Sequence, residues 1–127
     1  MFHFTVETDK SVDEAVQAVE ASLKERKFGV LWHFDLTGTL QSKGIDFTKP
    51  YRVLEVCNPV QAQRVLTQNS LVGYFLPCKI VVYEDDGKTK IGLPRPSVLM
   101  DTISDPQLRD IANEVEQTLI EAVEAAK

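Results

Sequence analysis

The chain is poor in cysteine, glycine and proline and has no long uncharged stretch, and each of these absences argues against a class of protein. Its 127 residues include only two cysteines, six glycines and six prolines, which argues against a disulfide scaffold and a linker-rich or fibrous chain. The longest stretch without a charge, residues 65–78, is too short for a membrane span, which needs about 20 apolar residues. The first residues lack the basic head and apolar run of a signal peptide. We therefore expect a cytoplasmic protein without a membrane partner, in which both thiols are reduced.

Basic residues are also in short supply. The chain carries 14 Lys and Arg against 19 Asp and Glu, a net charge of −5. A nucleic-acid binder needs a basic surface, so we expect no nucleic-acid partner. Residues 105–127 hold six acidic and two basic residues and so most of the negative charge. We interpret this segment as the solvated face of a helix, with an acidic docking surface as the alternative.

What the chain does contain is typical of one globular domain over residues 1–127: 43% hydrophobic and 26% charged residues. Alternation and β-formers predict strands over residues 2–7, 30–36, 51–57, 78–85 and 89–93. Helical spacing predicts a helix that begins after Ser11 and ends at Gly29, a short one after Asn58-Pro59, and a long one after Asp105-Pro106. Single helical turns are expected within residues 37–50 and 97–103, and residues 71–77 are expected to be extended or irregular.

This order of elements favours an α+β fold. Only one strand-helix alternation is clean, so a curved, mainly antiparallel sheet with the two long helices on one face is expected rather than a doubly wound parallel sheet. The opposite face carries Leu and Val of the third and fourth strands together with polar groups. We expect part of that face to meet a second copy of the chain, which predicts a homodimer.

The two cysteines are the first candidates for chemistry. Cys57 ends the third strand and Cys78 begins the fourth. If these strands are antiparallel neighbours, the thiols lie at one edge of the sheet. If a crossover makes the strands parallel, the thiols lie about 20 Å apart. The stretch 71–77 can return the chain, which favours the antiparallel arrangement.

The two cysteines have two possible roles, one as reactive thiols and one as buried structural residues. Lys79, or the start of the helix after Cys57, is positioned to lower a thiol pKa. This would suit a thiol-dependent enzyme or redox sensor that uses Cys57 or Cys78 with His33 or Glu55 nearby. Free cysteine is, however, commonly buried as a small hydrophobic residue. Their spacing fits neither a zinc motif nor a Cys-x-x-Cys pair, and we expect no metal.

Histidine is rare, and the familiar motifs are missing. His3 and His33 both fall on the polar phase of their strands, which places them on one sheet face, and His33 and Asp35 point the same way. The chain has no dinucleotide, phosphate-loop, zinc-protease or nucleophile-elbow motif. We therefore expect no cofactor.

Several segments together resemble a known family. These segments are Phe34-Asp35, Val53 to Pro59, Gly73, Leu76-Pro77-Cys78, Val82-Tyr83-Glu84 and Asp86-Gly87. They resemble the domain of unknown function 302 family over nearly the whole chain. The resemblance implies a β-α-β4-α domain of the TATA-binding-protein-like fold class that often forms dimers, and it implies no established activity. Many members carry other residues at Cys57 and Cys78 but keep the Asn-Pro and Leu-Pro positions, which favours a structural role for these prolines.

Two functional hypotheses follow, together with a simpler one. The first is a non-catalytic homodimer that binds a small ligand or partner near the Cys57/Cys78 edge, with an apolar mouth formed by Leu71, Tyr74, Phe75 and Leu76. Its candidate binding residues are Asp35, Glu55, Cys57, Asn58, Pro77 and Cys78. The second is the thiol-dependent enzyme or redox sensor. The third is an assembly module whose only role is the dimer contact.

Overall fold

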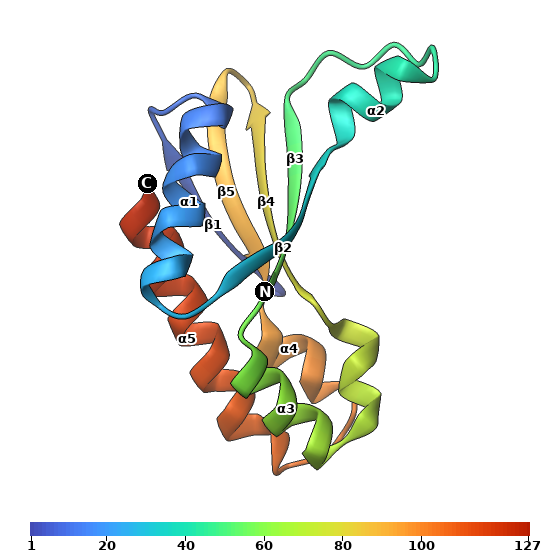
Figure 1. Ribbon diagram of the computed structural model, residues 1–127, viewed down its shortest axis with the longest axis vertical. Helices are drawn as coiled ribbons and strands as arrows, with labels where there is room; N and C mark the ends of the chain where they lie inside the picture. The colour runs from blue at the N-terminus through green and yellow to red at the C-terminus, as the bar shows by residue number, and fades with distance from the viewer.

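A computed structural model describes residues 1–127 and has one five-stranded antiparallel sheet (Figure 1). The strands are β1 (His3–Thr8), β2 (Gly29–Asp35), β3 (Tyr51–Cys57), β4 (Cys78–Asp85) and β5 (Lys88–Pro94). Their order across the sheet is β1-β5-β4-β3-β2. The expected α+β class and the antiparallel sheet are confirmed, and the bounds of β3 and β4 are those that the sequence predicts.

Two long helices, α1 (Val12–Glu25) and α5 (Leu108–Ala126), cover one face of the sheet (Figure 1). We call this the helix face. Alternate residues of the three central strands point to it and are at most 2% exposed: Leu54, Val56, Ile80, Val82, Ile91 and Leu93. They pack against the apolar faces of both helices in a single core of 17 buried residues. Burial of this apolar surface is the main force that holds the helices on the sheet.

The start of α1 and the β4–β5 hairpin turn are both specified by residues close together in the sequence. Ser11 and Glu14 form a capping box in which each side chain bonds to the other's backbone N–H, as the sequence predicts. Asp86 and Gly87 both have positive φ angles at the hairpin turn. The expected end of α1 at Gly29 is wrong. The helix ends at Glu25, and Lys27 adopts the left-handed conformation with a φ of 65°, so Gly29 already belongs to β2.

A β-bulge in β2 changes which side chains face the helices. The register between β2 and β3 shifts between Val30 and Trp32, with Leu31 as the extra residue. Val30 therefore points to the helix face, whereas Trp32 and Phe34 point to the other face, which we call the open face. The single alternation expected over residues 30–36 is wrong because it did not include this extra residue.

The same bulge overturns the expectation that the two histidines share a face. His33 pairs with the buried Leu54 and lies near Glu20 of α1, on the helix face. His3 lies on β1, at the opposite edge of the sheet, and its neighbour Phe4 packs against the core, so His3 points to the open face. His33 and Asp35 do point the same way, since both contact the guanidinium group of Arg52.

Three further helices gather at the Cys57/Cys78 end of the sheet (Figure 1). They are α3 (Pro59–Gln68), the 3₁₀ helix η1 (Ser70–Phe75) and α4 (Pro96–Asp101), and they pack with the start of α5 in a second apolar cluster. The expectation that residues 71–77 are extended or irregular is wrong for residues 71–75, which belong to η1. The side chain of Asn69 caps η1 through the backbone N–H of Leu71, and Val72 is fully buried in the cluster.

One element stands away from the body of the fold. The short helix α2 (Leu36–Ser42) and the loop after it project from the far ends of β2 and β3 (Figure 1). None of the residues of α2 is buried. No helix of the protein is both long enough and apolar enough to cross a lipid bilayer.

Candidate functional site

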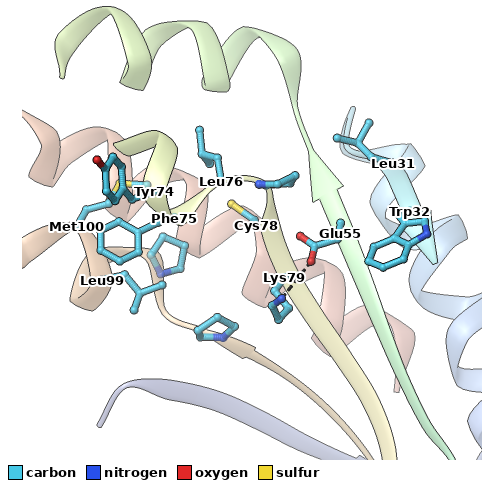
Figure 2. A pocket seen from close by; sticks show the side chains of 13 residues that line it. Leu31, Trp32, Glu55, Tyr74, Phe75, Leu76, Cys78, Lys79, Leu99 and Met100 are labelled. Atoms are coloured by element: carbon cyan, nitrogen blue, oxygen red, sulfur yellow. Dashed lines mark hydrogen bonds and ion pairs between the residues drawn. The ribbon is translucent and has the colours of Figure 1, made fainter. Parts of the chain in front are cut away.

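The open face of the sheet ends in a cavity where the sheet meets η1 and α4 (Figure 2). Its volume is about 550 Å³, which lies within the range of small-molecule sites. The residues that line it come from six elements and from the segments that join them. They are Leu31, Trp32, Glu55, Tyr74, Phe75, Leu76, Pro77, Cys78, Lys79, Pro94, Pro96, Leu99 and Met100.

The two charged residues of the cavity bond to each other. The Nζ of Lys79 on β4 donates to the Oε1 of Glu55 on β3 over 3.0 Å, and the two residues are partners in the ladder between those strands. The side chain of Glu55 is 17% exposed, whereas that of Lys79 is 46% exposed. Figure 2 shows this pair between Trp32 on one side and the side chains of η1 and α4 on the other. The wall of the cavity is thus mostly apolar, and its only two charged side chains are paired with each other.

Trp32 reaches the cavity because of the bulge at Leu31. It pairs with Glu55 in the β2–β3 ladder and stacks on Phe34, with ring centroids 5.0 Å apart. Its side chain remains partly open to solvent, since the residue is 55% exposed. Without the extra residue, Trp32 would follow Val30 onto the helix face, and the cavity would lack this wall.

A buried carboxylate holds the α4 wall in place. Glu116 of α5 accepts bonds from both the backbone N–H and the hydroxyl of Ser97, at 3.1 and 2.6 Å, and it also pairs with Arg95. It therefore caps the first turn of α4, where Arg95 gives no side-chain cap of its own. This bonding positions Pro96 and Leu99 against the sheet.

The two cysteines lie at the same rim of the sheet. Cys78 is the ladder partner of Val56, so Cys57 lies one residue beyond it on the neighbouring strand. The antiparallel pairing that the sequence favours is the observed one. Both residues line a second, smaller apolar cavity of about 20 Å³ beneath α3, and Cys78 also lines the main cavity. Cys78 packs against the apolar core on the helix face.

Neither thiol is activated. Burial raises the pKa of Cys78 to about 11, with smaller contributions from Cys57 and Glu55. Burial also raises the pKa of Cys57. The expectation that Lys79 or the start of α3 lowers a thiol pKa is therefore wrong. Lys79 points to the opposite face from Cys78 and bonds to Glu55, so its charge does not offset the cost of burying a thiolate.

The structure brings together some of the sequence-predicted binding residues and separates others. Glu55, Pro77 and Cys78 line the main cavity. Cys57 and Asn58 line the small cavity beside it, and the side chain of Asn58 caps α3 by accepting bonds from two backbone N–H groups. Asp35 lies at the other end of β2, where it caps α2.

Other predictions about the site have mixed outcomes. Of the four residues expected at the mouth, Tyr74, Phe75 and Leu76 line the cavity, whereas Leu71 does not. His33, assigned to the alternative thiol mechanism, lies on the helix face beside Arg52 and Glu20, away from this cavity.

Sequence reasoning missed about half of the cavity. The missed residues are Leu31, Trp32, Pro94, Pro96, Leu99 and Met100, together with Lys79 as the partner of Glu55. One signal was available, because Pro94 at the end of β5 and Pro96 at the start of α4 mark a rigid, bent segment where the strand ends. The position of Trp32 had no comparable signal.

These features define a small α+β domain that has helices on one face of an antiparallel sheet and an apolar cavity at one end of the other face. The chain belongs to the family described as domain of unknown function DUF302, whose model matches residues 4–126. A solved structure, described as uncharacterized conserved protein DUF302 from Bacillus stearothermophilus, is 49% identical to this chain. It superposes with a TM-score of 0.97, covering 100% of this chain and 99% of that one. A comparison with curated proteins gave no match.

Proposed function

We propose that the protein is a non-catalytic domain that binds a small molecule in the cavity between β2, β3, β4, β5, η1 and α4, and that it does so as a homodimer. The observation that carries the proposal is the cavity itself, which has about 550 Å³ of space, mostly apolar walls and one convergent polar pair. Such a combination of apolar walls and few placed polar groups is typical of ligand sites.

The side chains that line the cavity are better suited to binding a ligand than to catalysis. A nucleophilic thiol needs a lowered pKa and a nearby base, whereas burial raises the pKa of both cysteines. Glu55 is neutralised by Lys79, and His33 points to the other side of the sheet. No observation therefore favours the thiol-dependent enzyme or redox sensor. Two free cysteines fit the reducing cytoplasm, where we place the protein.

The open face supports the dimer. Its large apolar side chains lie in two stacked aromatic pairs and a central valine pair, and none is fully buried: Trp32 with Phe34, Tyr51 with Tyr83, and Val53 with Val81. The expected leucine is absent from this face, because Leu54 points into the core. Charges here are paired within the chain, as in Glu55–Lys79 and Asp85–Lys90. A face without excess charge suits a second copy of itself better than a nucleic acid.

The binding proposal has a built-in reporter, because Trp32 is the only tryptophan of the chain. Titration with 1-aminoanthracene, an uncharged apolar fluorophore, is expected to quench the Trp32 emission and to saturate. Leu99→Asp places a charge in the wall and should weaken binding at least tenfold. Val60→Asp is the matched control on an exposed residue outside the cavity and should leave binding unchanged. Unsaturable or absent quenching in the folded wild-type protein would refute the site.

The dimer is tested separately by sedimentation velocity. The wild-type chain is expected to sediment as a dimer, and Val81→Lys, in the centre of the open face, should give a folded monomer. Val60→Lys provides the control, since it adds the same charge elsewhere. A wild-type protein that stays monomeric over the accessible concentration range would overturn the dimer and leave the cavity proposal intact.

A further inference from the structure

The chemistry of the cavity wall narrows the class of ligand. Of the 13 lining residues only Glu55 and Lys79 carry charge, and they are bonded to each other. We infer, on the basis of the proposed binding function, that the ligand is an uncharged planar heterocycle whose edge carries an N–H donor next to a C=O acceptor, as in a lactam or a cyclic imide.

The absence of a free charge argues for an uncharged ligand. A carboxylate bonded to Lys79 would lie beside the carboxylate of Glu55, and an ammonium group bonded to Glu55 would lie beside the ammonium of Lys79. Either ligand would bring two like charges together. Since the side chain of Glu55 is only 17% exposed, water screens that repulsion poorly, and the charged ligand is disfavoured. A neutral ligand leaves the pair intact.

The unused bonding capacity of the pair argues for adjacent donor and acceptor groups. Oε1 of Glu55 accepts from Lys79, and the second carboxylate oxygen, Oε2, has no hydrogen-bond partner in the chain. A carboxylate can accept several bonds, and an ammonium group has three donors, of which Lys79 uses one here. The pair therefore offers one acceptor and further donors side by side on adjacent strands. The N–H and C=O of a lactam are complementary to that arrangement.

The remaining walls argue for a flat, rigid ring system. Trp32 stands on one side of the ion pair, and Tyr74 and Phe75 stand across the cavity from it (Figure 2). Pro94 and Pro96 add rigid rings to the wall. Aromatic side chains favour stacked or edge-on contacts with planar ligands, and the volume of about 550 Å³ accommodates a system of two or three fused rings.

The test compares two probes of nearly equal size and ring structure. Lumichrome is a neutral three-ring system with N–H and C=O groups on one edge, and 1,3-dimethyl-lumichrome lacks the N–H donors. Quenching of Trp32 emission, corrected for absorption by the probes, gives each dissociation constant. We expect lumichrome to bind at least tenfold more tightly. We also expect it to bind more tightly than 1-naphthoate and 1-naphthylmethylammonium, which carry one charge each.

Variants assign the preference to the ion pair. Glu55→Leu should remove the tenfold preference for lumichrome, and the more conservative Glu55→Gln should reduce it, with folding of both verified by circular dichroism. Asp85→Asn is the matched control, because it weakens another ion pair of the same sheet, the Asp85–Lys90 pair, outside the cavity. Equal binding of the two lumichromes, or tighter binding of a charged probe, would overturn this inference and leave the proposed function standing. Quenching by none of these probes nor by 1-aminoanthracene would refute both.

Discussion

Cys57 and Cys78 lie on adjacent antiparallel strands one residue out of register, so they share a rim of the sheet, and both line the small apolar cavity beneath α3. This relationship satisfies the sequence-based hypothesis that the thiols gather at one edge. It also explains why they do not form an activated pair. Cys78 packs against the apolar core, and burial stabilises its neutral form.

The first prediction concerns thiol reactivity. Because thiolate is the nucleophile and burial raises the pKa of Cys78 from 9.0 to about 11, Cys78 has about 100-fold less thiolate at pH 8 than an ordinary thiol. We expect iodoacetamide to label Cys78 at least that much more slowly than it labels the unfolded chain. Mass spectrometry of Cys57→Ser and Cys78→Ser variants separates the two sites. A cysteine that reacts faster than in the unfolded chain would revive the thiol-enzyme hypothesis.

The second prediction concerns stability in alkaline solution. The pKa of Cys78 is higher in the folded state than in the unfolded state, so the folded state binds more protons between pH 9 and about 11. Its contribution to stability is therefore complete below pH 9 and is lost as the pH rises, by at most about 2–3 kcal/mol. Urea denaturation at pH 7, 9 and 10.5 should show this loss.

The comparison with Cys78→Ala isolates this thiol. Tyr51, whose pKa burial also raises, adds a loss of the same sign at higher pH. The variant retains Tyr51 but lacks the titrating thiol, and it should lose less stability over the same range. Equal slopes for the two proteins would show that the thiol is not desolvated in the fold.

The third prediction separates two roles for Asn58. Its side chain caps α3 through the N–H groups of Val60 and Gln61, at 3.0 and 3.2 Å. Asn58→Ala should lower the free energy of unfolding by about 1 kcal/mol, whereas Asn58→Asp, which retains a good cap, should have little effect. Binding of lumichrome should change less than twofold in either variant. A selective loss of binding in a fully stable Asn58→Ala protein would instead make Asn58 a ligand residue.

How far the sequence predicts this fold depends on how local each signal is. Both the β4–β5 turn and the capping box at Ser11 rest on residues within a few positions of each other, and both are observed. The end of α1 was missed because Gly29 looks like a stop signal, whereas Lys27 takes the left-handed position instead. The 3₁₀ helix η1 was missed because its formation depends on burial of Val72 among residues of α4 and α5.

The residues of the candidate site likewise fall into those that the sequence predicts and those that depend on tertiary contacts. The segment from Tyr74 to Cys78 was predicted, since an unusually apolar loop beside a strand is visible in the sequence. The single alternation expected over residues 30–36 put Trp32 on the same face as Val30, because Val30, Leu31 and Trp32 are all apolar and fit either phase of a strand. Only the pairing of β2 with β3 decides which of the three is the extra residue.

The type and order of most elements and the antiparallel α+β class were thus readable from the sequence, which also favoured, without settling, a common rim for the two thiols. These follow from side-chain periodicity and turn chemistry, which act over a few residues. The tertiary structure alone decided the register shift at Leu31, the raised pKa values of the thiols and the assembly of the cavity from separate elements. The register of a strand, the desolvation of a thiol and the shape of a cavity all depend on which distant residues come into contact. A local sequence pattern does not specify those contacts.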